Sequence, residues 1–429
     1  MSSDWRTVKL SEVAIEVTVG FVGTMTNEYI DHGIPFLRSL NVDRFKINSR
    51  DIRYISRDFH SRISKSRLIP GDVVIVRTGK PGTCAVIPEE LPESNCSDLV
   101  IVRCGSEILN RFFCYYVNSA ASNHIAAHLV GAVQQHFNVA SAKTMEIPLP
   151  PIQEQKAIAH ILGTLDDKIE LNRKTNETLE AMAKALFKSW FVDFDPVRAK
   201  AEGRPTGLPA EISDLFPDSF EDSELGEIPS GWKVKSLDKV AHFLNGLALQ
   251  KFPPEDGAPT LPVIKIAQLK KGDSIGADRC STAVPSDYVV RDGDMLFSWS
   301  GSLAVDIWCG GDGALNQHLF KVTSKTYGKW FFYQWVKHHL PEFQEIAQGK
   351  ATTMGHIQRH HLSEAMALIP KPSLLAAMDS AFAPLLDRAF GLRKQSNDLA
   401  TTRDALLPKL ISGELRIPDA EKLLEEVGI

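Results

Sequence analysis

A seven-residue pattern of apolar positions runs through the stretch between residues 152 and 190. The steps between these positions alternate between four and three: Ile158, Leu162, Leu165, Ile169, Asn172, Asn176, Leu179, Ala183, Leu186 and Trp190. This spacing predicts a long helix whose narrow apolar seam needs a partner helix. Pro150 and Pro151 favour a helix start directly after them, and we expect the helix to close at Asp193 and Pro196. Asn172 and Asn176, at the middle of the seam, are expected to fix the register between the two helices.

A second seam of the same kind lies 220 residues later, counted from Ile158 to Met378. Its positions are Met378, Phe382, Leu385, Ala389, Leu392, Ser396, Leu399, Arg403, Leu406 and Leu410. Identical residues support the correspondence, since Arg173-Lys174 matches Arg393-Lys394 at the same offset. We therefore expect two long helices that pack on each other. The alternative is two unrelated surface helices, each packed on its own domain.

The segment before each helix is repeated as well. Trp232-Lys-Val-Lys-Ser-Leu copies Trp5-Arg-Thr-Val-Lys-Leu, and Leu261-Pro-Val-Ile-Lys265 copies Ile34-Pro-Phe-Leu-Arg38. A Gly-Asp turn that leads into a strand recurs at Gly71 and at Gly293. The offset falls slowly from 227 to 222, as small deletions in a duplicated unit would cause. The sequence thus predicts an α+β fold with two similar globular domains, two long helices and a pseudo-twofold internal repeat.

These patterns divide the chain into six segments. The expected bounds are a first globular domain at 1–151, a first helix at 152–195, a linker at 196–230, a second globular domain at 231–372, a second helix at 373–416 and a tail at 417–429. The linker is rich in Pro, Gly and acidic residues, which favours an extended connector. Its apolar residues Leu215, Phe216 and Phe220 indicate that part of it packs.

Composition adds a charge asymmetry. The 429 residues are too many for one core, and the net charge is −5. Between Phe36 and Lys80, however, eleven Lys and Arg stand against four Asp, which predicts a basic face on an acidic protein. The six cysteines show no paired spacing, and no signal peptide or membrane-spanning apolar run is visible. We therefore expect a cytoplasmic protein with reduced thiols.

Catalytic motifs are missing from the sequence. Gly79-Lys80 is followed by proline and does not form a phosphate loop, no dinucleotide fingerprint is present, and Asp195-Pro196-Val197 lacks the second proline and aromatic of an adenine methyltransferase. Glu154-Gln-Lys156 has a nuclease-like spacing but opens a helix, where capping explains it better. His356, His360 and His361 have helical ligand spacing, yet a solvated or DNA-facing cluster is favoured over a zinc site. We expect a non-catalytic chain without a cofactor or metal of its own.

The helical and linker motifs resemble those of the specificity (S) subunits of type I restriction-modification systems. The resemblance covers nearly the whole chain and is most specific in PPIQEQKAIAHIL, LDDKIELNRK, LEAMAKALFKSWFVDFDPVRAKAEGRP, IPSGWKV and RDALLPKLISGEL. It implies two target-recognition domains that each read one half of a split site on double-stranded DNA. It also implies antiparallel coiled-coil helices that bind two methyltransferase (M) subunits, with restriction (R) subunits completing the complex. In one departure, Ala376-Ala377 stands where Glu154-Gln155 would be expected.

Candidate DNA contacts lie at matched loop positions of the two halves. Arginine pairs with guanine, and Gln or Asn with adenine, while Lys and Arg also bind phosphates. The candidates are Arg38, Arg62, Lys65, Arg67, Arg77, Thr78, Lys80, Gln134, Gln135, His136, Asn138, Lys265, Ser298, Trp299, Ser300, Thr352, Thr353 and His356. The candidates for partner binding are Glu154, Gln155, Trp190 and Phe191. For each single DNA candidate, an ordinary surface or turn residue remains the competing interpretation.

Two other functions compete with DNA reading by such a subunit. One is a coiled-coil scaffold that joins proteins without touching DNA, and the basic excess between Phe36 and Lys80 argues against it. The other is a fused restriction-methylation enzyme, which the missing motifs disfavour. S-adenosylmethionine, ATP and magnesium would belong to the partner subunits.

Overall fold

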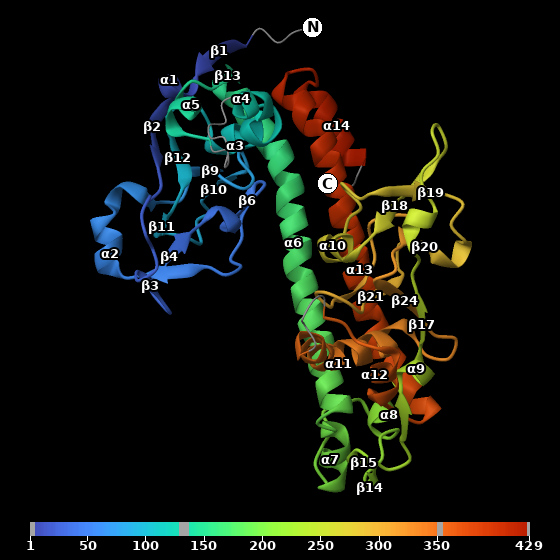
Figure 1. The fold of residues 1–429 in the computed structure, drawn as a ribbon. Helices are drawn as coiled ribbons and strands as arrows, with labels where there is room; N and C mark the ends of the chain where they lie inside the picture. The colour runs from blue at the N-terminus through green and yellow to red at the C-terminus, as the bar shows by residue number, and fades with distance from the viewer. Residues whose placement is uncertain (1–4, 128–136, 350–354, 427–429) are drawn as a thin grey trace. The chain divides into compact units, whose positions relative to one another are not determined.

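The computed structural model describes residues 5–127, 137–349 and 355–426. It divides into two compact units (Figure 1). Unit 1 contains residues 1–168 and 399–429, and unit 2 contains residues 169–398. Each unit therefore holds one globular domain together with parts of both long helices. No helix in the described part of the chain is long and apolar enough to span a membrane.

The two predicted long helices are present and equal in length. Helix α6 (Ile152–Phe191) and helix α13 (Pro372–Ile411) each have 40 residues, and their bounds differ by the predicted offset of 220. All predicted seam positions are buried or half-buried.

The helices pack on each other in opposite directions. Within unit 2, Asn172 Nδ2 donates to Gln395 Oε1 at 2.9 Å, and the Trp190 ring centre lies 5.6 Å from that of Phe382. The partner's number falls as the α6 number rises, as in antiparallel helices. The prediction of a helix pair is confirmed, and the alternative of unrelated surface helices is wrong.

The first helix ends earlier than predicted. Helix α6 stops at Phe191, because Phe194 adopts a left-handed backbone with φ of 56°. Pro196 does not close this helix; it lies in the first turn of a separate helix, α7 (Asp195–Ala201), where its missing N–H is tolerated.

The predicted connector and tail are folded. The connector holds α7, α8 (Ala210–Ser213) and a hairpin of β14 (Phe220–Ser223) with β15 (Gly226–Pro229). Val197, Phe216 and Ile228 are buried in the aromatic core that surrounds the end of α6, so apolar burial overrides the polar composition. The tail forms α14 (Ile417–Glu426), whose proline and acidic residue in the first turn favour a helix start.

The globular part of unit 1 contains two main sheets. One has the order β10-β9-β12-β2, and the other β3-β7-β4-β11-β8. Their strands are β2 (Ala14–Val19), β3 (Tyr29–Ile30), β4 (Ile34–Leu37), β7 (Arg53–Ile55), β8 (Arg67–Leu68), β9 (Val73–Val76), β10 (Cys84–Val86), β11 (Ser94–Cys96) and β12 (Leu99–Cys104). Two small ribbons pair β1 (Arg6–Lys9) with β13 (Glu146–Leu149) and β5 (Val42–Asp43) with β6 (Lys46–Ile47). Its short helices are α1 (Leu10–Val13), α2 (Arg57–Arg62), α3 (Asn110–Ser119), α4 (Ser122–Ala127) and α5 (Val139–Lys143).

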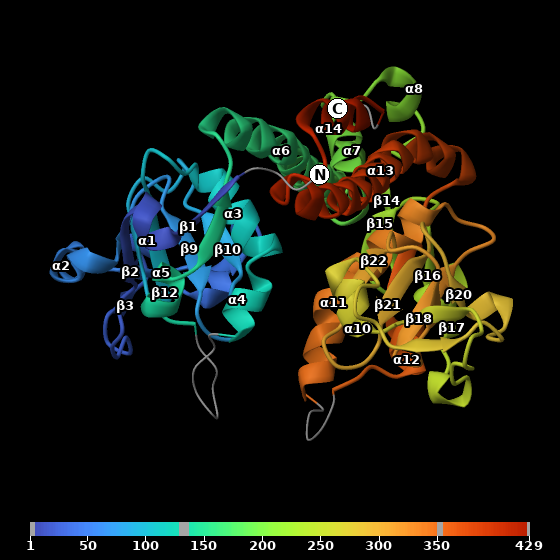
Figure 2. The same ribbon diagram turned by 90° about the horizontal axis from the view of Figure 1, so that it is seen from above.

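Unit 2 repeats this topology. Its sheets have the orders β17-β24-β21-β22 and β19-β18-β23-β20, and its ribbon pairs β16 with β25. The strands are β16 (Lys233–Ser236), β17 (His242–Asn245), β18 (Thr260–Ile264), β19 (Arg279–Ser281), β20 (Val289–Val290), β21 (Met295–Ser298), β22 (Val305–Ile307), β23 (Gly313–Leu315), β24 (Leu319–Thr323) and β25 (Met366–Ile369). The helices are α9 (Leu237–Val240), α10 (Ile266–Lys271), α11 (Lys329–Gly349) and α12 (Arg359–Glu364). Helix α11 lies against β22 as α3 lies against β10 (Figure 2). The predicted internal repeat is confirmed.

The structural repeat corrects one detail of the sequence alignment. Leu149 pairs with Arg6 in the ribbon of unit 1, and Ile369 pairs with Lys233 in that of unit 2. Leu149 therefore corresponds to Ile369, an offset of 220. At this offset Glu154-Gln155 corresponds to Leu374-Leu375, and not to Ala376-Ala377 as the sequence alignment suggested.

Candidate nucleic-acid interface

Arg77, a predicted base reader, is held inside unit 1. It follows strand β9, and its side chain is only 15% exposed. Its Nη1 donates to Asp98 Oδ1 at 2.6 Å, and its Nε donates to the Phe137 carbonyl at 3.0 Å. Thr78 donates to the other oxygen of Asp98 at 3.2 Å. Arg77 thus anchors the chain at Phe137, and reading a guanine would require breaking the ion pair between Arg77 and Asp98.

Arg38 is also paired. It follows β4, and its Nη2 donates to Asp51 Oδ2 at 2.9 Å. The hydrogen bond from Arg38, helped by the charges of Arg38 and Arg53, lowers the pKa of Asp51. Asp51 has a φ of 49°, so the bond holds a loop in a backbone conformation that side chains rarely adopt.

The basic run from Arg57 to Arg67 is mixed in character. Arg62 is 66% exposed and lies 3.4 Å from Glu28, a surface ion pair of little strength. Lys65 is exposed, and no ion pair within the described residues involves it. Arg67 is half-buried, with a buried Nε that has no hydrogen-bond partner in the described part of the chain. Arg57, Arg62 and Lys65 are therefore the accessible cations of this run, and among them only Lys65 forms no ion pair within the described residues.

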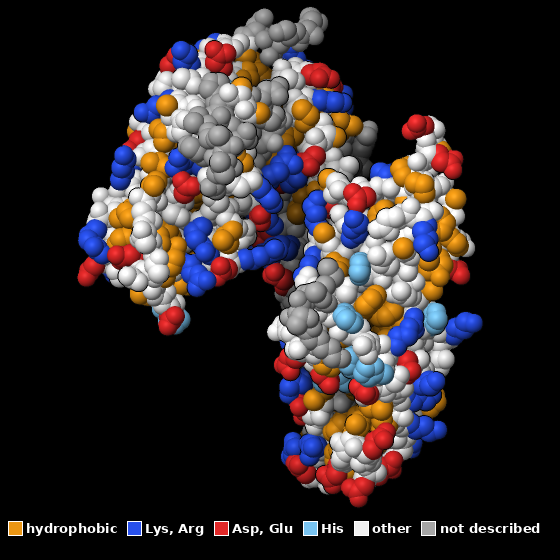
Figure 3. All heavy atoms as spheres, in the orientation of Figure 1, with side chains coloured by type: hydrophobic (Ala, Val, Ile, Leu, Met, Phe, Trp, Pro, Cys, Tyr) orange, Lys and Arg blue, Asp and Glu red, His pale blue; other side chains and the backbone are white. Residues whose placement is uncertain are grey.

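The basic excess of unit 1 is partly neutralised. Figure 3 shows its Lys and Arg side chains standing beside Asp and Glu. In the stretch between Phe36 and Lys80, four exposed cations form no ion pair within the described residues: Lys46, Arg50, Lys65 and Lys80. These four carry the free positive charge of the segment.

The third group of candidates in unit 1 lies around Phe137. Asn138 is the N-cap of α5, where its Oδ1 accepts the N–H of Ser141 at 2.8 Å. Gln134, Gln135 and His136 lie outside the described residues, as do Thr352 and Thr353 of the second half.

In unit 2, two predicted serines are buried and bonded internally. Ser298, in β21, exchanges hydrogen bonds with Ala304, whose N–H donates to the hydroxyl at 2.7 Å. The Ser300 hydroxyl lies 2.9 Å from Nδ1 of His318. The expectation that Ser298 contacts DNA is not met, because its side chain is fully buried. Ser300 instead orients His318, a residue absent from the sequence-based list.

Trp299 is the centre of an aromatic cluster at the end of β21. Its Nε1 donates to Asn245 Oδ1 at 2.8 Å and to the Gln317 carbonyl at 3.1 Å. The rings of His318 and His356 lie 5.9 and 6.2 Å from it. Several histidine side chains gather on the visible face of unit 2 (Figure 3).

Arg359 joins the same cluster, with its guanidinium 5.6 Å from the centre of the Phe320 ring. Lys265 instead pairs with Asp278 at the start of α10 and remains half exposed. The sequence offered little indication that His318 and Arg359 belong to this cluster. His318 lies in the turn before β24, and Arg359 opens a short helix after the undescribed residues.

One ligand-like group appears in unit 2 beside this cluster. Among the described residues, ligand atoms of His360, His361 and Glu364 lie within 4.8 Å of one another. His361 Nδ1, however, accepts the N–H of Gln358 at 2.9 Å as a helix cap. The ring proton then belongs on Nε2, so metal binding by His361 would have to disrupt the cap.

The comparisons agree with one another. Residues 2–181 match the model of the type I restriction modification DNA specificity domain. The specificity subunit of the type I restriction enzyme MjaIX of Methanocaldococcus jannaschii is 26% identical over 97% of this chain and 94% of its own length. The HindI specificity subunit of Haemophilus influenzae is 24% identical over 64% of this chain and 70% of its own length. Over the matched lengths, this chain is thus similar to specificity subunits of type I restriction enzymes. A crystal structure of an S subunit from M. genitalium has the same fold, with a TM-score of 0.57 and 15% identity over 95% of this chain and 96% of its own.

Three of the four predicted partner-binding residues of this chain face inward. Gln155 is fully buried, accepting the Leu109 N–H at 2.8 Å and donating to the Glu107 carbonyl at 2.9 Å. Trp190 and Phe191 belong to the aromatic core of unit 2. These three stabilise the chain's own fold, and the expectation of a partner surface there is wrong.

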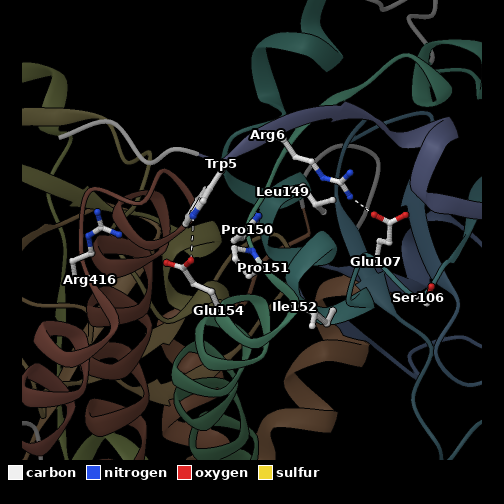
Figure 4. A pocket seen from close by; sticks show the side chains of 10 residues that line it. All are labelled: Trp5, Arg6, Ser106, Glu107, Leu149, Pro150, Pro151, Ile152, Glu154 and Arg416. Atoms are coloured by element: carbon white, nitrogen blue, oxygen red, sulfur yellow. Dashed lines mark hydrogen bonds and ion pairs between the residues drawn. The ribbon is translucent and has the colours of Figure 1, made fainter.

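Glu154 is the exception, because it lines a cavity of about 660 Å³ in unit 1. In Figure 4 it lies below Trp5, whose Nε1 donates to its Oε2 at 3.2 Å. Pro150, Pro151 and Arg416 form other parts of the wall. Glu154 therefore remains a residue that a partner can reach.

Proposed function

We propose that this chain is the specificity subunit of a type I restriction-modification system, and that it binds double-stranded DNA and reads a bipartite site, one half with each globular domain. The observation that carries the proposal is the repetition of one topology with different polar side chains at matched positions. Arg77 and Asp98 stand at the strand ends of the first domain, where the second has Trp299, Gln317 and His318. Two similar scaffolds with unlike contact residues would recognise two unlike half-sites.

The two domains would bind DNA by different chemistry. In the first, free cations such as Lys65 and Lys80 supply phosphate contacts, while Arg77 keeps its neighbouring chain segment in place. In the second, His318 and His356 lie beside Trp299, and Arg359 lies over the Phe320 ring, so that this cluster offers ring N–H and guanidinium donors. Imidazole and guanidinium groups hydrogen-bond to base edges and phosphates.

The outer face of α6 in unit 2 suits a methyltransferase subunit. Leu171 is 56% exposed and Met182 is 48% exposed, and the exposed Thr178 lies between them. Thr178 lies seven residues after Leu171 and four before Met182, and these intervals place the three side chains on one face of the helix as a second stripe. An apolar stripe outside the helix pair is the surface that a further helix would cover.

Restriction subunits would join the assembled complex and complete the restriction enzyme. In this proposal, the methyl transfer, ATP hydrolysis and DNA cleavage, with S-adenosylmethionine, ATP and magnesium, belong to those partners. A scaffold without DNA readout would need neither the free cations of unit 1 nor the polar cluster around Trp299.

Salt dependence tests the DNA contact directly. We expect Lys65→Gln and Lys80→Gln each to reduce the slope of log affinity against log salt by about 0.9, because each lost phosphate contact releases one fewer counterion. The measurement is binding to a duplex of fixed length at several salt concentrations. Arg57→Gln is the matched control, since Arg57 is 80% exposed but already lies 3.3 Å from Glu93. Slopes equal to that of the unmodified chain in both lysine variants would mean that these lysines are only solvated surface.

A further inference from the structure

One carboxylate in unit 1 joins three elements. The Tyr115 hydroxyl of α3 donates to Asp166 Oδ2 at 2.6 Å, and Arg403 of α13 donates from Nη1 to Asp166 Oδ1 at 2.6 Å. Asp166 itself belongs to α6, so the globular domain and both long helices meet at this group. The side chains of Asp166 and Arg403 are 21% and 13% exposed. Removing one partner from such a shielded pair leaves the other charge poorly solvated.

An aromatic contact supports the same guanidinium. The Arg403 Cζ lies 4.6 Å from the centre of the Phe45 ring, and that ring lies 5.2 Å from the Tyr115 ring. Phe45 has a φ of 70°, an uncommon conformation for an aromatic residue, and its N–H donates to the Cys84 carbonyl at 2.9 Å. The loop between β5 and β6 is thus held in a strained shape that presents a ring to Arg403.

The charges at this junction are well matched. Burial, together with the Asp166 charge, raises the pKa of Tyr115 well above its usual range. The hydroxyl therefore stays protonated and keeps donating to Asp166. The Asp166 charge and hydrogen bond raise the pKa of Arg403 against the opposing effect of burial, which keeps the guanidinium charged.

The second domain is attached by residues that do not correspond. In unit 2, Arg393 of α13 pairs with Asp306 of β22. The position that matches Arg393 in α6 is Arg173, which pairs with Glu170 and Glu177 on its own helix. The contacts that attach the first domain to the helices therefore differ from those that attach the second, although the domains themselves are duplicated.

We propose that Asp166, Arg403 and Tyr115 are positioning residues that set the spacer length accepted between the two DNA half-sites. The inference rests on the proposed reading of a bipartite site. These residues act by holding the first domain in one orientation on α6 and α13, and both helices continue into unit 2. A firmly held domain meets its half-site at one separation, whereas a loosened domain accepts neighbouring separations.

The test compares spacer preferences. The full chain, in complex with its methyltransferase subunit, is offered a DNA library in which the two half-sites are separated by spacers of different lengths. The unmodified chain should direct methylation to one spacer length. In Arg403→Met and Asp166→Asn, sites one base pair longer or shorter should be methylated about tenfold more than with the unmodified chain, as expected for a lost coupling of this kind. The half-site sequences should stay the same.

Controls separate the possible outcomes. Arg173→Met removes an arginine of the same helix pair whose ion pairs among the described residues all lie within α6, and it should keep the single spacing. Tyr115→Phe removes one hydroxyl and keeps the ring, so it tests the idea even where the charge variants unfold. If Arg403→Met folds and still methylates sites of a single spacer length, the inference is overturned. If Arg403→Met does not fold, the same result for Tyr115→Phe overturns it. A library in which the unmodified complex selects no two-part motif instead contradicts the proposed function.

Discussion

Exchange of the first globular domain should change one half of the methylated DNA motif and leave the other half intact. Strands β1 and β13 pair with each other from Arg6↔Leu149 to Lys9↔Glu146, so the domain begins and ends on neighbouring strands. Residues 5–149 can therefore be replaced as one block by those of a relative with a different target, while every residue of the two long helices is kept. The replaced half of the motif should be lost completely, since the base contacts of that domain leave with it.

The reciprocal exchange provides the control. Strands β16 and β25 close the second domain in the same way, from Lys233↔Ile369 to Ser236↔Met366. Exchange of residues 233–369 should change only the other half of the motif. Sequencing of methylated DNA reads both halves in one experiment. A change in both halves after either exchange would contradict independent reading.

Charge placed on the outer stripe of α6 should strongly weaken assembly with the methyltransferase subunit. Leu171→Asp and Met182→Asp each introduce a carboxylate into a surface that we expect a partner helix to cover. Burial of an unpaired charge at the centre of an interface weakens binding by about 30-fold or more per position. Both side chains are exposed in the free chain, so the fold and the thermal unfolding temperature should change little.

The matched control for this stripe is Ile275→Asp. Ile275 is another exposed apolar residue of unit 2, but it lies outside the long helices. The Ile275→Asp variant should bind the methyltransferase subunit with the same affinity as the unmodified chain, as measured by titration calorimetry or co-purification. Undiminished binding by both α6 variants would show that the partner uses another face, with the cavity at Glu154 the next surface to test.

The sequence predicted the features that depend on local periodicity. The two helices follow from a seam that repeats every seven residues, and the duplicated domains follow from matched motifs at nearly constant offsets. The helix end was misplaced because the left-handed conformation at Phe194 depends on the packing around it, which no local pattern reveals. The connector was underestimated because single apolar residues such as Phe216 become buried only when a distant aromatic core is present.

The candidate site was less predictable for a related reason. Arg77 is an exposed-looking arginine after a strand, but Asp98, 21 residues later, neutralises it in the folded chain. Gln155 belongs to a family motif, yet its amide bonds to the segment around Glu107 and Leu109. Sequence reasoning identifies residue types suited to DNA, but ion pairs between distant strands decide which of them stay available. His318 was missed because its position beside Trp299 comes from the fold alone.

The most direct test of the central claim is sequencing of methylated DNA from cells that produce the methyltransferase subunit with or without this chain. The account predicts a two-part methylated motif with a fixed spacer when the chain is present, and loss of that motif when it is absent. The same methylated motif in cells without the chain would contradict the claim that this protein supplies the sequence specificity.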